Sequence, residues 1–80
     1  MPDYVLHHRH EPTECAASFA AWNGFASPLR RACAVASCVF GGHEVWWTVT
    51  AADADEALAR LPRYVAERTT ASRVAKIEVP

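Results

Sequence analysis

The clearest periodic pattern in this chain is the alternation of apolar and polar side chains over His43 to Thr50. One face of this stretch carries Val45, Trp47 and Val49, and the other carries Glu44, Trp46, Thr48 and Thr50. Such alternation predicts a strand with one face against a core. The sequence predicts three further strands, at Asp3 to His10, Ala32 to Phe40 and Arg73 to Val79. Gly41-Gly42 is expected to form a two-residue hairpin turn.

Two stretches have the spacing of helices. Pro12 suits the first turn of a helix over Thr13 to Trp22, and its apolar face is expected to carry Cys15, Phe19 and Trp22. Asp53 with Glu56 predicts an acidic capping box at the start of a second helix. The apolar side of that helix carries Ala57, Leu58, Leu61 and Val65. Pro62 is expected to kink or split it near Leu61.

The predicted order is strand, helix, strand, strand, helix, strand. This is the ferredoxin-like βαββαβ pattern, an α+β fold with a four-stranded antiparallel sheet and two helices on one face. A single domain over residues 1–80 is expected for this length. Right-handed crossovers place the first and third strands side by side in the middle of the sheet, antiparallel to each other.

Composition changes this picture by predicting a partner. The chain has 80 residues, of which 51% are hydrophobic, and so short a chain buries a marginal core by itself. We therefore expect a homodimer. The net charge of −1 and the scattered basic residues argue against nucleic acid as a partner. No apolar run approaches the roughly 20 residues of a membrane span, and no signal peptide is evident. The expected location is the cytoplasm, where the three cysteines are thiols.

Residues that bind metals are expected to gather at one edge of the sheet. Antiparallel pairing brings the end of the first strand beside the beginning of the third and the end of the second. If the turn holds only two residues, Cys38 pairs with Val45 and shares a face with His43. The candidate metal ligands are His8, His10, His43, Cys38 and Cys15, with Glu14 beside them. Imidazole and thiolate suit zinc, nickel or copper.

The same residues have simpler interpretations, which stay open. The cysteines can be small buried side chains of the core, and the histidines can be solvated at a polar sheet end. Glu44 and Trp46 lie on the face expected to be open, where they either bind a small molecule or form a dimer interface.

The order of elements, the length and the aromatic open face resemble the dimeric α/β-barrel superfamily of small ferredoxin-like bacterial proteins. The stretch from Asp55-Glu56-Ala57-Leu58 through Pro62-Arg63-Tyr64-Val65 is similar to helices of some members. That group includes uncharacterised bacterial domains, nickel-binding proteins, muconolactone-isomerase-like enzymes and cofactor-free monooxygenases. The resemblance implies two sheets packed face to face in a dimeric α/β barrel. It implies no single chemistry, because fold does not decide function.

Three functions follow as hypotheses. The first is a small metal-binding homodimer with a His/Cys site at one end of the sheet. The second is a cofactor-independent enzyme, an isomerase or monooxygenase, acting on a small aromatic or ketonic molecule with His8 or His43 as general base. The third is a non-catalytic structural or regulatory module.

Overall fold

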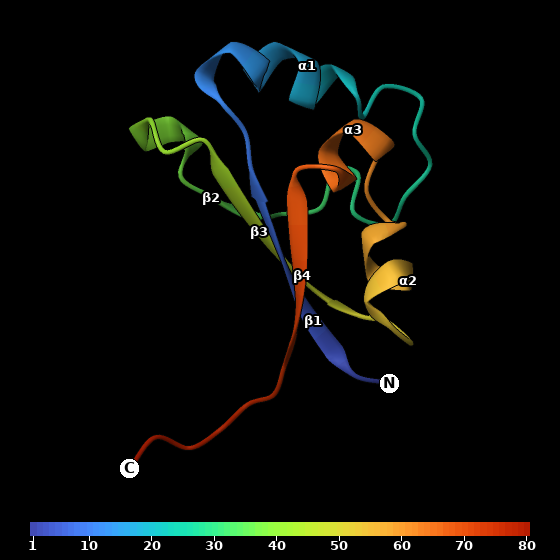
Figure 1. Ribbon diagram of the computed structural model, residues 1–80, viewed down its shortest axis with the longest axis vertical. Coiled ribbons are helices and arrows are strands. Elements are labelled where there is room, and N and C mark those ends of the chain that lie inside the picture. Colours follow the sequence, from blue (N-terminus) through green and yellow to red (C-terminus); the bar gives the residue numbers. More distant parts are fainter.

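The computed structural model describes residues 1–80 as an α+β fold built on a four-stranded antiparallel sheet (Figure 1). In chain order the elements are β1 (Asp3–Arg9), η1 (Pro12–Glu14), α1 (Cys15–Ala20), β2 (Val35–Ala36), η2 (Cys38–Phe40), β3 (Glu44–Thr50), α2 (Ala54–Leu58), α3 (Arg63–Ala66) and β4 (Thr69–Val74). The strands lie in the order β2-β3-β1-β4. The expected antiparallel pairing of the first and third strands at the centre of the sheet is therefore confirmed.

One face of the sheet packs against the helices and forms the core. Along β1, burial alternates, with Tyr4, Leu6 and His8 buried. The core side of β3 carries Trp47 and Val49, which are also buried, as the alternation predicted. Ala57 from α2, Val65 from α3 and Leu61 from the link between them complete the same cluster. The apolar contacts thus hold β1 and β3 in the register on which the site depends.

The second helical region follows its sequence signals closely. Asp53 accepts a hydrogen bond from the Glu56 backbone N–H at 2.8 Å, and this capping begins α2. Pro62 then separates α2 from α3, since its ring cannot continue a helix and α3 begins at the next residue. The Asp53 cap and the break at Pro62 are confirmed. The second arm of the expected capping box differs, because the Glu56 carboxylate accepts from the Ala52 N–H at 3.0 Å and not from that of Asp53.

The second strand is much shorter than predicted. Only Val35–Ala36 pair with β3, and Cys38–Phe40 form a 3-10 turn. Ser37 ends the ladder because its carbonyl accepts the Gly42 N–H and its hydroxyl accepts the Glu44 N–H. Gly42 lies so close to Ser37 that a Cβ at this position would collide with the serine side chain. The expected two-residue Gly41-Gly42 hairpin is wrong, since the connection spans residues 37–43.

Two further predictions are wrong in detail. The last strand is Thr69–Val74, not Arg73–Val79, because β1 begins at Asp3, whose partner in β4 is Val74. Beyond that pair the ladder has no partner strand, and Ile77 and Val79 are exposed. In the first helix, which ends at Ala20, Phe19 is 63% exposed while Ser18 is buried. Trp22, which follows α1, packs against the core in place of Phe19.

Candidate metal centre

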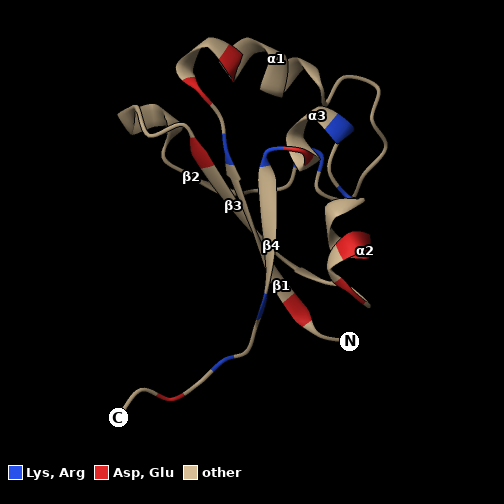
Figure 2. Ribbon diagram, in the orientation of Figure 1, with Lys and Arg blue, Asp and Glu red and all other residues tan.

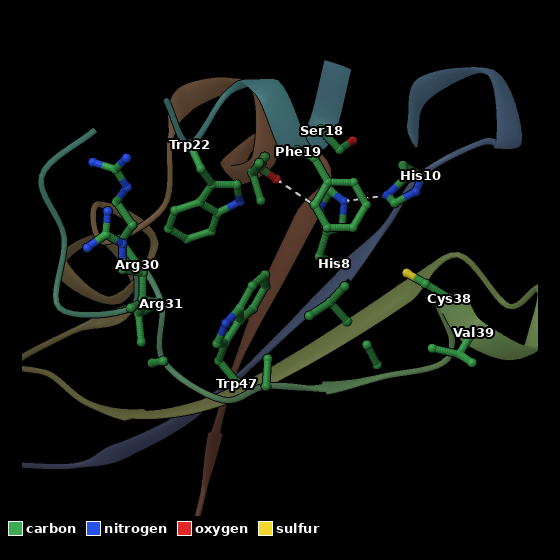
Figure 3. A pocket seen from close by; sticks show the side chains of 16 residues that line it. His8, His10, Ser18, Phe19, Trp22, Arg30, Arg31, Cys38, Val39 and Trp47 are labelled. Atoms are coloured by element: carbon green, nitrogen blue, oxygen red, sulfur yellow. Dashed lines mark hydrogen bonds between the residues drawn. The ribbon is translucent and has the colours of Figure 1, made fainter. Parts of the chain in front are cut away.

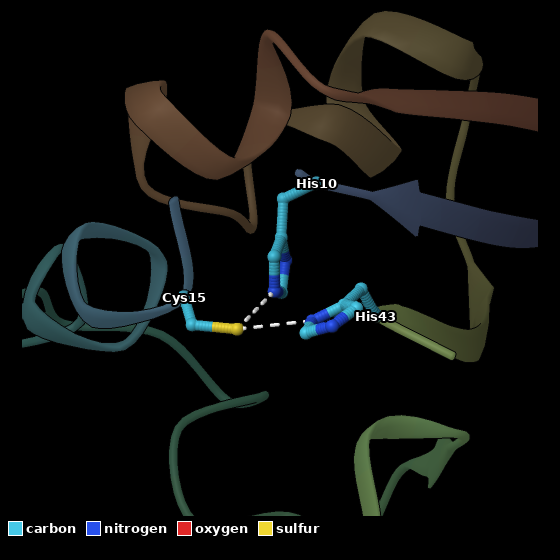
Figure 4. A group of neighbouring side chains, drawn as sticks. All are labelled: His10, Cys15 and His43. Atoms are coloured by element: carbon cyan, nitrogen blue, oxygen red, sulfur yellow. Dashed lines mark hydrogen bonds between the residues drawn. The ribbon is translucent and has the colours of Figure 1, made fainter. Parts of the chain in front are cut away.

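Three potential ligand atoms converge at the end of the central strand pair, from His10, Cys15 and His43 (Figure 4). All of these atoms lie within 4.8 Å of one another. His10 follows the last residue of β1, and His43 precedes the first residue of β3. Because Arg9 pairs with Glu44, the two histidines are the next positions along the antiparallel pair. The His10 N–H donates to the His43 carbonyl at 3.2 Å, which extends the pairing to the site.

Cys15 reaches this point because the chain turns back sharply after β1. The Glu11 N–H donates to the Glu14 side chain at 2.9 Å, and Pro12 lies in the 3-10 turn between them. The Glu14 carboxylate also accepts from the Arg68 guanidinium at 2.8 Å, which ties the turn to the segment between α3 and β4. α1 therefore begins beside the end of β1, with Cys15 as its first residue.

These contacts shift the pKa values of Glu14 and Arg68 in opposite directions. The backbone N–H of Glu11 and, after it, the Arg68 side chain lower the pKa of Glu14 below its ordinary value. The hydrogen bond to Glu14 raises the pKa of Arg68. Both groups are therefore ionised around neutral pH. Figure 2 shows acidic and basic positions interspersed along the elements. The ion pair of Glu14 with Arg68 joins two segments that are distant in the sequence.

A chain of hydrogen bonds determines which nitrogen of His10 faces the cysteine. His8 Nδ1 lies 3.2 Å from the Val65 carbonyl, which can only accept, so Nδ1 carries the hydrogen and donates. In the neutral imidazole, His8 Nε2 is then an acceptor, and it lies 2.8 Å from His10 Nδ1. His10 Nδ1 must therefore donate. The remaining nitrogen, His10 Nε2, keeps its lone pair and lies 3.1 Å from Cys15 Sγ.

His8 is neutral in this arrangement for a physical reason. The side chain is 2% exposed, and desolvation by burial lowers its pKa below the ordinary value of 6.5. The Val65 hydrogen bond opposes this shift, and the nearby His10 adds to it. A neutral His8 supplies the acceptor that His10 needs. His8 therefore orients the imidazole of His10, a candidate metal ligand, from the side away from Cys15.

His43 completes the group from the other strand. Its Nδ1 lies 3.1 Å from Cys15 Sγ, and its backbone has φ of 54°, in the left-handed region that few residues other than glycine adopt. A zinc ion bound tetrahedrally holds a thiolate sulfur and an imidazole nitrogen about 3.5 Å apart. The two observed S–N distances are a few tenths of an ångström shorter. Binding of an ion would therefore move Cys15 Sγ away from each imidazole nitrogen by a few tenths of an ångström.

The predicted site residues thus divide into two groups. His10, Cys15 and His43 are brought together, and His8 contacts His10 from behind. Cys38 is not in the group. The expected pairing of Cys38 with Val45 is wrong, because Val45 pairs with Ala36 and Cys38 lies in the 3-10 turn. The contribution of Val65 was missed, since a backbone carbonyl leaves no signal in the sequence.

Glu44 and Trp46 lie on the opposite, open face of the sheet. The His7 ring stacks on Trp46, with the ring centroids 5.1 Å apart and the planes within 2°. His7 Nε2 also lies 2.9 Å from Glu44 Oε1. Trp47 points into the core, so the expected division of the two indoles between the faces is confirmed. The open face therefore presents a cross-strand His-Trp-Glu group separate from the metal centre.

Comparison of the chain with models of protein families, with curated proteins and with solved structures finds no match. No helix has both the length and the apolar composition that crossing a membrane requires.

Proposed function

We propose that this protein binds a transition metal ion, zinc above all, through His10 Nε2, Cys15 Sγ and His43 Nδ1. The observation that carries the proposal is the position of Cys15 Sγ, 3.1 Å from a nitrogen of each histidine. The hydrogen bond to His8 supports it, because it leaves the lone pair of His10 directed at the site. Three protein ligands leave a fourth position for water or a substrate, as in catalytic zinc sites.

Zinc suits this set of ligands better than a copper site of the electron-transfer type. Such copper sites add a weak axial ligand, commonly methionine, to two histidines and a cysteine. The only methionine of this chain is Met1, which is 80% exposed and precedes β1. His10 follows the last residue of β1, and His43 precedes the first residue of β3. Both therefore lie at the end of β1 opposite to Met1. A borderline-soft ion without geometric demands fits the donor set as it stands.

The test is a titration of the metal-free, reduced protein with Co²⁺ and with Zn²⁺. Tetrahedral Co²⁺ bound to a thiolate has a characteristic charge-transfer absorption, and Zn²⁺ affinity follows from competition with a chelating dye. We expect one ion per chain. Cys15→Ala and His43→Gly should each abolish the Co²⁺ spectrum. Glycine is chosen at 43 because it tolerates the positive φ.

Cys38→Ala provides the matched control, since it removes a thiol outside the group. It should leave both the stoichiometry and the affinity unchanged. Unaltered Co²⁺ binding by Cys15→Ala, or binding far below one ion per chain in the wild type, would refute the proposal.

A second candidate function uses the same atoms without a metal. His10 Nε2 can take the proton of the Cys15 thiol, which yields a thiolate and an imidazolium, and His8 orients that base. The protein would then be a cofactor-independent enzyme with a cysteine nucleophile. Alkylation of the metal-free protein, mapped by mass spectrometry, should modify Cys15 faster than the exposed Cys33. Slower modification of Cys15 than of Cys33 would argue against this candidate.

We also propose that the chain adopts a ferredoxin-like arrangement and pairs through its open face as a homodimer. The strand order β2-β3-β1-β4, with the helical segments packed on one face, supports the arrangement. The half-buried Trp46 and its stack with His7 support the pairing. Sedimentation equilibrium should give twice the chain mass for the wild type and a weakened dimer for Trp46→Ser. A wild-type monomer at all concentrations would exclude the pairing.

A further inference from the structure

A cavity of about 440 Å³ opens on the helix-covered side of the sheet, between α1, the sheet and residues 29–36 (Figure 3). Its volume lies within the range of small-molecule sites in proteins. Most of the residues that line it are apolar. His10, which belongs to the metal centre, forms part of the wall, so the cavity and the metal centre are neighbours.

Two tryptophans give the cavity an aromatic interior. Trp22 and Trp47 have ring centroids 6.0 Å apart, with planes inclined by 47°. Trp22 also packs edge-on against Phe25, which holds its ring in place. Indole faces attract flat, apolar rings in stacked or tilted contact. The interior therefore favours an aromatic body over a branched or strongly polar one.

The charges around the cavity have one sign. Arg30 and Arg31 are its only charged lining residues apart from histidine, and no carboxylate lines it. Neither guanidinium takes part in an ion pair within the chain. Figure 3 shows both arginines at one end of the cavity and His10 and Cys38 at the other. A ligand with an anionic group at one end would meet unpaired guanidinium donors, which bind carboxylates well.

We propose that this cavity binds a small aromatic carboxylate, with its ring packed against Trp22 and Trp47 and its carboxylate at Arg30 and Arg31. The proposal goes beyond metal binding and does not depend on it, because none of these four residues is a candidate metal ligand. The protein therefore has two adjacent sites, one for an ion and one for an organic anion.

The test uses 2-naphthoate and its cationic analogue 2-naphthylmethylamine, which share a ring system and differ in charge. Binding is followed by ¹H–¹⁵N NMR in the full chain, both metal-free and loaded with zinc. The indole N–H signals of Trp22 and Trp47 should shift with naphthoate. Trp46, on the other face of the sheet, serves as the internal control and should not shift. The amine should bind at least about tenfold more weakly, since it lacks the charge-assisted hydrogen bonds.

Variants of the arginines separate charge recognition from apolar binding. Arg30→Gln combined with Arg31→Asn should reduce the naphthoate affinity about tenfold and leave that of the amine unchanged. Asparagine is chosen at 31 because the backbone there has φ of 67°. Arg73→Ala, which removes an exposed charge from β4, is the matched control.

Any one of four results would overturn the proposal. Three of them are the absence of indole shifts at millimolar naphthoate, equal affinities for the acid and the amine, and shifts at Trp46 as large as those at Trp22. A cavity filled by a second copy would show indole shifts that follow protein concentration without ligand, and this too would refute the proposal. A failure of metal binding would leave all of these measurements interpretable.

Discussion

Replacing His8 with phenylalanine is the sharpest test of how the metal centre is built. His8 is not one of the three candidate ligands, yet its Nε2 accepts the hydrogen bond from His10 Nδ1 at 2.8 Å. Phenylalanine keeps a ring at this buried position and removes both nitrogens. The Val65 carbonyl keeps a partner, because Thr69 Oγ1 donates to it at 2.7 Å. Thr69 Oγ1, which lies 3.2 Å from His8 Nδ1, also keeps this bond to Val65, so the change leaves only His10 without its partner.

The expected loss follows from the burial of His10, which is 5% exposed. Removal of its acceptor leaves a buried donor unpaired, at about 1–3 kcal/mol. The metal-free protein can avoid this cost by moving the proton of His10 to Nε2, where it would donate to Cys15 Sγ and occupy the lone pair that binds the ion. Loss of such outer partners weakens metal binding by about 10- to 100-fold, or about 1.4–2.7 kcal/mol. We expect His8→Phe to lie in this range.

The extra volume of phenylalanine should not dominate the result. Overpacking in a dense core costs about 1–3 kcal/mol, but His8 also lines the cavity of about 440 Å³, which offers room. Zn²⁺ affinity is measured by competition with a chelating dye. Long-range ¹H–¹⁵N spectra of the imidazoles report which nitrogen carries the proton. His7→Phe is the matched control, since His7 is the neighbouring residue on the open face.

A His8→Phe protein that binds Zn²⁺ as tightly as His7→Phe does would refute this role of His8. A wild-type spectrum with the proton of His10 on Nε2 in the metal-free state would refute it independently. In that case the Val65 carbonyl would not determine the tautomers of the two histidines.

Three more predictions concern stability and pH. Since the folded-state pKa of Glu14 is lowered, its contribution to stability is present above the ordinary value of 4.5 and is lost as pH falls through the folded-state pKa. Urea midpoints of Glu14→Gln, measured against pH, should lack this acid loss. A wild-type profile parallel to that of Glu14→Gln would contradict the prediction. His8 also has a lowered pKa, so stability should already decline as pH falls below 6.5, a decline that His8→Phe should remove and that its persistence would disprove. Leu6→Ala, at a fully buried position in β1, should reduce the free energy of unfolding by about 3–5 kcal/mol in urea titrations; a loss below about 1 kcal/mol would mean that β1 is not the centre of the core.

Local sequence signals predicted those elements whose causes are local. Alternation along residues 43–50 predicted β3 and the opposite orientations of Trp46 and Trp47. The acidic cap at Asp53 and the break at Pro62 predicted how the second helical region begins and divides. Each of these features depends on neighbours within a few residues. None of them depends on which residues lie across the sheet.

The misplaced elements are those whose limits are determined by a partner. β2 ends early because Ser37 bonds the turn that precedes β3, and β4 ends at Val74 because β1 supplies no further partner. Burial of Ser18 in place of Phe19 depends on how α1 lies over the sheet. Composition and periodicity contain no information on these distant pairings.

The sequence by itself predicted that His10, Cys15 and His43 would gather at one edge of the sheet, together with His8 and Cys38. Antiparallel pairing of the first and third strands places the two histidines opposite each other, and the short turn after β1 returns the cysteine to them. Tertiary structure alone decided that Cys38 would be left out and that His8 would orient a ligand. The physical reason is that the hydrogen bond of His8 ends on Val65, 57 residues away in the chain, and only packing of α3 against β1 brings that carbonyl within reach.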